Sequence, residues 1–342
     1  MRNDKSRNFF PTFWRILLLS LICLGAVTAC PSRQFPTPPR PALPTLEDID
    51  LYDIRVPLPE RPACLALNPF TGKIYVGYQD YPYLTVVDST THKIQREVAL
   101  PSSAHHITLN PVTNRIYSLN SQHGTVTVLD GELDTLITEL KGGRSPQGLA
   151  VDPQTNTVYV TDEKHGEVNV IDGRTYAVTA QIEVGRQPKG IAVNPRMNLI
   201  YVANWRDDTV SIIDGATRQV LDTPLVGSEP DAIVIDAEQG QAFIANTRSN
   251  NVYVLDQQAV TGVIPVRESP GRLAIDPLHH WLFVANTKNH SISVIHARDH
   301  YVIKTSPTLA FPLDVAIYPE KKLLYAIHRD RPALFVAQIL IE

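Results

Sequence analysis

Short apolar runs separated by turn residues recur along most of the chain, and they are clearest between Ser145 and Arg186. Each run is rich in β-branched or aromatic residues, which is typical of β-strands. Asp and Pro favour the first two positions of a turn, and Gly tolerates positive φ, so dipeptides such as Asp152-Pro153 mark the strand ends. The four expected strands are Gly148–Asp152, Thr157–Thr161, Glu167–Ile171 and Val178–Val184. The last strand alternates with a period of two, and no part of this stretch has a helical pattern.

This four-strand pattern occurs seven times, as expected for a sheet too small to bury its own faces. The proline of Ser145-Pro146 recurs as Pro62, Pro188, Pro230, Pro270 and Pro312, with Ala104 in the second copy, and the spacings from Pro62 onward are 42, 42, 42, 42, 40 and 42 residues. The second-strand aromatic recurs as Tyr75, Tyr117, Tyr159, Tyr201, Phe243, Phe283 and Tyr325. An Asp ends the third strand at Asp88, Asp130, Asp172, Asp214 and Asp256, and His296 and Gln338 replace it later. A period near 40 with four strands predicts an all-β, seven-bladed propeller of antiparallel blades.

The two ends of the repeat array predict how the ring closes. The seventh copy, from Phe311, has room for only three strands before Glu342. A matching fourth strand precedes the first copy, because Tyr52, Ile54, Val56 and Leu58 lie three periods before Val178, Ala180, Ile182 and Val184. We therefore expect Leu51–Leu58 to add as the outer strand beside Ala333–Ile341, which removes two exposed sheet edges.

The second strands carry a recognisable motif. YVTD (159–162), YVAN (201–204), FIAN (243–246) and FVAN (283–286) resemble the repeats of YVTN-family β-propellers. The resemblance covers roughly residues 51–342 and implies a seven-bladed propeller, but that family does not share one function. Copies five to seven depart from the pattern at Ala237, at His296 and Gln338, and by two missing residues before Pro270. We interpret these departures as local turn changes rather than a lost blade.

The segment before the repeats has the features of a lipoprotein leader. Basic residues precede the apolar core Ile16–Ala26, which is too short to span a bilayer as a helix. Val27-Thr28-Ala29-Cys30 resembles a bacterial lipobox, in which the cysteine is lipidated and becomes the new N-terminus. The alternative is a cysteine that lies near an ordinary cleavage site by coincidence. We expect a signal peptide over 1–29, a lipidated Cys30 with a Pro-rich tether over 30–50, and the propeller over 51–342. The protein would then be extracytoplasmic and anchored to a bacterial membrane, at the outer membrane or cell surface.

Charge and cysteine content exclude some classes of partner. The formal net charge of −4 becomes about −7 without the leader, and no basic stripe is visible, which argues against nucleic acid. Once Cys30 is lipidated, Cys64 has no intramolecular disulfide partner. Cys64 occupies a position that is glycine in other copies, so we expect a small buried thiol. We expect a monomer whose partners are the membrane, through the lipid, and a protein or small-molecule ligand.

Candidate functional residues gather in two sets of loops that share one end of a propeller, around its central channel. The candidate ligand-binding residues are Arg144, Arg186, Lys189, Trp205, Glu229, Asp231 and Arg272. Arg144 and Arg186 lie one blade apart and could hold an anion together, because guanidinium groups match carboxylate or phosphate. Trp205 is either a stacking platform or a cap over the channel. Polar loops facing solvent are also expected without any ligand.

Four histidines at the same end suggest a divalent metal site, although solvated loop residues are the plainer interpretation. They are His105, His106, His123 and His165. General-base chemistry is a further alternative for them. Signatures such as G-x-S-x-G, H-E-x-x-H, C-x-x-C and a phosphate-binding glycine loop are absent, so no catalytic residue and no cofactor is assigned. The sequence favours a binding or interaction module. The alternatives are a metal-assisted lactonase or lyase-like enzyme, and a metal or cofactor carrier.

Overall fold

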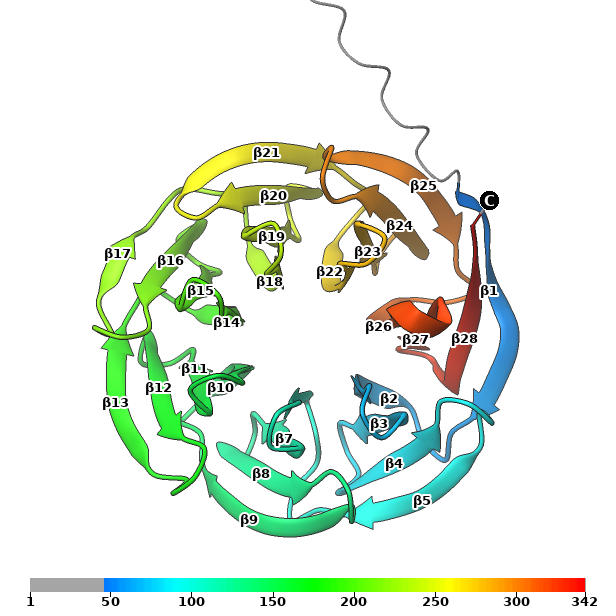
Figure 1. Ribbon diagram of the computed structural model, residues 1–342, viewed down its shortest axis with the longest axis horizontal. Coiled ribbons are helices and arrows are strands. Elements are labelled where there is room, and N and C mark those ends of the chain that lie inside the picture. The colour runs from blue at the N-terminus through cyan, green and yellow to red at the C-terminus, as the bar shows by residue number, and fades with distance from the viewer. Residues whose placement is uncertain (1–45, 342) are drawn as a thin grey trace, which may run out of the picture. The chain divides into compact units, whose positions relative to one another are not determined.

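The computed structural model of the protein describes residues 46–341, which form seven four-stranded antiparallel sheets and one short 3-10 turn, η1 (Pro319–Lys321). Figure 1 shows the sheets as blades of a ring, each with one strand near the centre and one at the outside. The predicted all-β, seven-bladed propeller is therefore confirmed. Within residues 46–341, no helix is long and apolar enough to cross a membrane.

The first four blades follow one another along the chain. Blade 1 contains β2 (Pro62–Asn68), β3 (Lys73–Tyr78), β4 (Tyr83–Asp88) and β5 (Ile94–Ala99). Blade 2 contains β6 (His106–Asn110), β7 (Arg115–Asn120), β8 (Thr125–Asp130) and β9 (Thr135–Lys141). Blade 3 contains β10 (Pro146–Asp152), β11 (Thr157–Asp162), β12 (Glu167–Asp172) and β13 (Val178–Glu183). Blade 4 contains β14 (Pro188–Asn194), β15 (Leu199–Asn204), β16 (Thr209–Asp214) and β17 (Val220–Asp222).

The remaining blades complete the ring. Blade 5 contains β18 (Pro230–Asp236), β19 (Gln241–Asn246), β20 (Asn251–Asp256) and β21 (Ala259–Pro265). Blade 6 contains β22 (Pro270–Asp276), β23 (Trp281–Asn286), β24 (Ser291–His296) and β25 (Tyr301–Pro307). Blade 7 contains β26 (Pro312–Tyr318), β27 (Leu323–His328), β28 (Arg331–Ile341) and, as its outer strand, β1 (Leu46–Pro57).

The ends of the chain close the ring as predicted, with a longer strand than expected. β1 pairs antiparallel with β28, in a register that sets Val56 opposite Leu334 and Leu46 opposite Ile341. The predicted strand began at Leu51, whereas β1 begins at Leu46 and ends at Pro57. The Leu58 N–H still donates to the Pro332 carbonyl at 2.9 Å, so the pairing continues to the predicted boundary. Blade 7 therefore has no missing strand.

The recurring aspartate stabilises the turn between the third and fourth strands. Asp172 Oδ1 accepts the backbone N–H groups of Arg174 and Thr175 at 2.9 and 2.7 Å, as Asx-turns do. Asp88, Asp130 and Asp214 make the same pair of contacts. In blade 6 the ring of His296 takes this role, because its Nδ1 accepts the Asp299 N–H at 3.1 Å. The replacement is a local turn change, as the sequence indicated.

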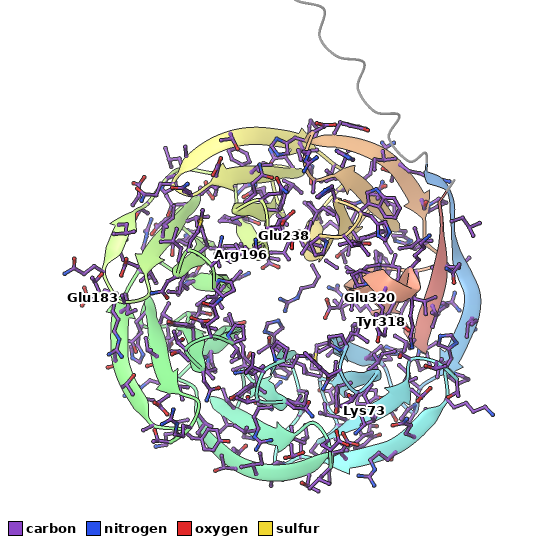
Figure 2. All side chains as sticks on the ribbon, in the orientation of Figure 1. Lys73, Glu183, Arg196, Glu238, Tyr318 and Glu320 are labelled. Carbon is purple, nitrogen blue, oxygen red and sulfur yellow. The ribbon has the colours of Figure 1, made fainter. Side chains whose placement is uncertain are left out.

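The core lies between neighbouring blades. The seven second-strand aromatics are all buried, at 3% exposure or less, and they pack against the apolar face of the next blade. The Tyr75 hydroxyl also donates to Asp134 Oδ1 of blade 2 at 2.7 Å. Lys73, labelled in Figure 2, reaches the same carboxylate at 2.9 Å. Because each blade is covered on both faces by its neighbours, burial of apolar surface holds the ring together.

Candidate functional site

Two sets of loops share one end of the ring, which we call the channel end. They are the loops between second and third strands and the segments that lead from each fourth strand into the next blade. Backbone hydrogen bonds of 2.7–2.8 Å join them, from Leu100 to Pro82, from Gly142 to Gly124 and from Val184 to Gly166. At the opposite end, turns of neighbouring blades pair through side chains, as Arg196 and Glu238 do at 3.4 Å (Figure 2).

The residue two positions after the recurring proline, or after Ala104 in blade 2, affects how closely neighbouring blades approach. These residues are Cys64, His106, Gly148, Gly190, Ala232, Arg272 and Asp314. A Cβ on Gly148 would lie 2.1 Å from the Lys189 carbonyl oxygen, so blade 3 can carry only glycine there. Blades 2, 6 and 7 carry ionisable side chains at the same position. The inner wall is therefore closely packed on one side of the ring and charged on the other.

A cavity of about 820 Å³ opens at the channel end, and a chamber of about 140 Å³ lies against it. Six blades line the larger cavity, which we call the mouth, and blade 4 contributes Lys189 to the chamber. Gln147, Asp231 and Arg272 line both, so the two spaces are adjacent. Arg61 and Arg329 stand at the mouth, and both are exposed. The ring thus brings side chains from distant parts of the sequence to one hollow.

Arg272 is the cation at the junction of the mouth and the chamber. Lys189, which shares the chamber, is already neutralised, because its Nζ lies 3.4 Å from Asp231 Oδ1 and 4.2 Å from the centre of the Trp205 ring. Within residues 46–341, the side chain of Arg272 makes no hydrogen bond or ion pair. A half-buried guanidinium without a carboxylate partner can accept an anion.

Asp314 lies near Arg272 but is held by backbone groups. Its Oδ2 accepts the Leu65 N–H at 3.1 Å and its Oδ1 accepts the Val315 N–H at 2.9 Å, which links blade 7 to blade 1. Burial raises the pKa of the Asp314 carboxyl, while Arg272 and the two N–H groups oppose that rise. Burial also raises the pKa of the Cys64 thiol, which indicates a buried structural cysteine rather than a nucleophile.

Burial lowers the pKa of both adjacent histidines of blade 2. For His106 the shift is large and Arg272 adds to it, so the imidazole is neutral near pH 7. Neither His105 Nε2 nor His106 Nδ1 has a hydrogen-bond partner within the described part of the chain. A neutral imidazole has one N–H that can donate to a ligand in the chamber.

A second hollow, of about 1130 Å³, lies between the loops of blades 3 and 4. His165 and Glu167 line this hollow, and their donor atoms lie within 4.8 Å of one another and of an oxygen of the buried Asp162. These three residues are the one such group of three or more in residues 46–341. These atoms already have partners: Asp162 Oδ2 accepts the Arg144 N–H at 2.7 Å, and Glu167 Oε1 accepts from Gln181 at 2.7 Å. The loop's own hydrogen bonds therefore account for the cluster.

The structure brings some of the sequence-predicted residues together and separates others. Lys189, Asp231 and Arg272 meet at the chamber. Arg186 pairs with Asp207 at 2.5 Å and Glu229 with Arg248 at 3.6 Å, and the side chain of Arg144 is exposed. His165 is in the cluster of Asp162 and Glu167, which contains none of the other three histidines. Arg61, Arg329 and Asp314 were missed, although Asp314 departs from the small residues at its position in blades 1, 3, 4 and 5.

Comparisons with known proteins support the fold alone. No family model and no curated protein matches the chain. Many solved structures share its fold. Among them is Kuenenia stuttgartiensis hydrazine synthase, with a TM-score of 0.74 and 19% sequence identity over 86% of this chain and 100% of that chain. Because identity is so low, this likeness concerns architecture only, and the resemblance to YVTN-type repeats stays a prediction.

Proposed function

We propose that the protein is a lipid-anchored, extracytoplasmic binding module that takes its ligand at the channel end. The observation that carries this proposal is the mouth, a cavity of about 820 Å³ with the unpaired Arg272 at its base. Ligand pockets typically measure about 300–1,000 Å³ and use a few convergent polar groups. Each blade supplies a different residue on a shared scaffold, which suits selective binding by a repeat protein.

Screening small molecules against the full chain, purified in detergent, tests this role. The readout is the shift in melting temperature with a panel of anionic, cationic and neutral metabolites. Gly271 lines the mouth, and a Cβ there would meet only ordinary contacts, so we expect Gly271→Trp to fill the cavity without unfolding the ring. Val112, 72% exposed on a turn at the opposite end, provides the matched control Val112→Trp.

We expect at least one compound to stabilise the wild type and Val112→Trp but not Gly271→Trp. A panel without a stabilising compound would contradict binding of small molecules, and stabilisation that survives Gly271→Trp would place the site elsewhere.

The location of the protein rests on Cys30, which lies outside the described residues. The basic leader, the short apolar core and the Val27–Cys30 motif support lipidation. Cys30→Ser, expressed in a bacterial host, should move the protein from the membrane pellet to the soluble fraction, whereas Cys64→Ser should stay in the pellet. Equal partition of Cys30→Ser and the wild type would contradict a lipid anchor.

Metal-based roles have less support. They comprise a metal-assisted lactonase or lyase-like enzyme and a metal carrier that uses His105, His106, His123 and His165. The donor cluster of Asp162, His165 and Glu167 is satisfied by its own loop. Metal analysis of the purified protein distinguishes these roles: one equivalent of metal that is lost in the double variant His105→Ala/His106→Ala would favour them over the binding module.

A further inference from the structure

Arg272 is unusual among the seven equivalent positions because it carries a long cationic side chain where three other blades have glycine or alanine. It lines both the mouth and the chamber, while Lys189 beside it is neutralised by Asp231. Leaving a guanidinium half-buried without a partner is costly unless water or a ligand completes its hydrogen bonds. The position therefore points to an anion.

The surrounding groups fit an oxyanion better than a cation or an apolar molecule. Four cationic side chains and two carboxylates line the mouth and chamber, in a protein whose net charge is −4. Hydroxyl groups of Ser121 and Ser269 also line the mouth, whereas Thr247 and Gln147 on the same wall already donate to Glu229 and Glu163. The neutral His106 imidazole adds a donor in the chamber. Hydroxyl, imidazole and guanidinium donors are groups that proteins use to bind carboxylates and phosphates.

The sizes of the two spaces suggest how such a molecule would lie. The chamber of about 140 Å³ has the volume of roughly five water molecules in liquid water. It can therefore hold one carboxylate or phosphate group but not a larger body. The mouth is about six times larger and is lined by Arg61 and Arg329. An organic molecule could thus place its anionic group at Arg272 and the rest of its body in the mouth.

We infer that the channel binds a small organic oxyanion, a carboxylate or phosphate compound, with its charged group on the Arg272 guanidinium. This inference rests on the proposed function and names the class of its ligand. The competing explanation is that Arg272 serves only as a counter-charge for Asp314. Asp314 accepts two backbone N–H groups and forms no ion pair with Arg272, so the guanidinium stays available.

Calorimetric titration of the full chain at constant ionic strength tests the inference. The probes are inorganic phosphate, succinate, citrate and a sugar phosphate, with glucose and choline as neutral and cationic comparisons. Arg272→Gln removes the positive charge and keeps a polar side chain. Arg272→Lys keeps the positive charge but lacks the planar guanidinium that can donate two parallel hydrogen bonds to one anion. Arg206→Gln is the matched control, because Arg206 is an exposed arginine at the same end but outside the mouth and the chamber.

We expect an anionic probe to bind the wild type and Arg206→Gln equally. Arg272→Gln should weaken binding by about tenfold to a hundredfold, with Arg272→Lys in between. The exposed pair Arg61→Gln/Arg329→Gln should weaken it less, and this variant cannot disturb the core. Phosphate and carboxylate probes distinguish the two chemistries by their relative affinities.

Three outcomes would overturn the inference. In the first, the wild type binds glucose or choline but no anionic probe, and Gly271→Trp abolishes that binding. The channel would then be a binding site, as proposed, but not one for anions. In the second, anion binding is unchanged in Arg272→Gln. In the third, the wild type binds no anionic probe and Arg272→Gln has a lower melting temperature than the wild type. Arg272 would then serve as a counter-charge for Asp314.

Discussion

Gly148 shows how a single residue controls the spacing of blades 3 and 4. A Cβ there would lie 2.1 Å from the Lys189 carbonyl oxygen, which belongs to the backbone of β14 and cannot move aside alone. Gly271 precedes the equivalent position in blade 6, and its Cβ would meet nothing closer than 3.4 Å. Both have ordinary negative φ, so the two glycines differ in space rather than in backbone strain.

We therefore predict that Gly148→Ala lowers the free energy of unfolding by about 1–3 kcal/mol, as overpacking does. Gly271→Ala should be neutral or slightly stabilising, because alanine restricts the unfolded chain. Urea denaturation of the two variants measures the difference. Equal losses in both would show that the close approach of the inner strands does not limit packing.

His328, at the end of β27, should make stability depend on pH. The residue is buried, and burial lowers its pKa to about 4, with Arg331 adding to and Asp330 opposing the shift. An unfolded histidine titrates near 6.5, so between pH 6.5 and 4 the unfolded state binds the proton that the folded state refuses. The contribution of His328 to the free energy of unfolding is therefore fully present above pH 6.5 and is lost as the pH falls from 6.5 to 4.

From pH 7 to pH 5 this histidine should reduce the free energy of unfolding by about 2 kcal/mol. His328→Gln should remove that part of the slope, whatever its effect on stability at pH 7. The pKa values of His105 and His106 are also lowered, so the free energy of unfolding of His328→Gln should still fall as the pH falls, but less steeply. Urea titrations at several pH values measure both slopes, and identical slopes would contradict a buried neutral His328.

At the scale of elements, the second and third strands of each blade were more predictable than the outer ones. Most of their residues are buried, so their apolar runs mark them clearly. Outer strands are half exposed. β17 has only three residues, because Pro224 has no N–H to continue the ladder with β16. β1 begins five residues before the predicted start, because Asp48 and Asp50 pair with β28 although aspartate is a poor strand former.

The alternation along β1 carries a prediction of its own. Val56 is 4% exposed and packs with Leu65 and Tyr325 between blades 1 and 7, whereas Ile54 is 38% exposed. Val56→Asp would bury an unpaired charge and should cost about 3 kcal/mol or more. Ile54→Asp should cost about 1 kcal/mol or less. Urea denaturation of the pair checks the register, and a reversed order would mean that the strand presents its other face.

For the whole molecule, the sequence predicted the ring but only part of the site. The number of blades follows from a sequence period that recurs in every copy. An irregular turn in one copy therefore does not change the predicted number of blades. The channel depends instead on residues that differ between copies and on the space between blades. Arg144 and Arg186 are neighbours in the repeat, yet Arg186 turns to Asp207. Arg272 and His106, four blades apart in sequence, meet at the same chamber.

Closure by β1 makes the stability of all seven blades depend on a segment at the start of the ring. Without β1, β28 would become an exposed edge, and the apolar cluster of Val56, Leu58 and Leu334 would lose its outer members. We predict that deletion of residues 1–58 lowers the urea midpoint strongly and promotes association. Deletion of residues 1–45 should leave one cooperative transition like that of the full chain. Chromatography and urea denaturation of both deletions measure this. If the two behaved alike, each blade would be stable through its adjacent neighbours, and the ring would not need to be closed.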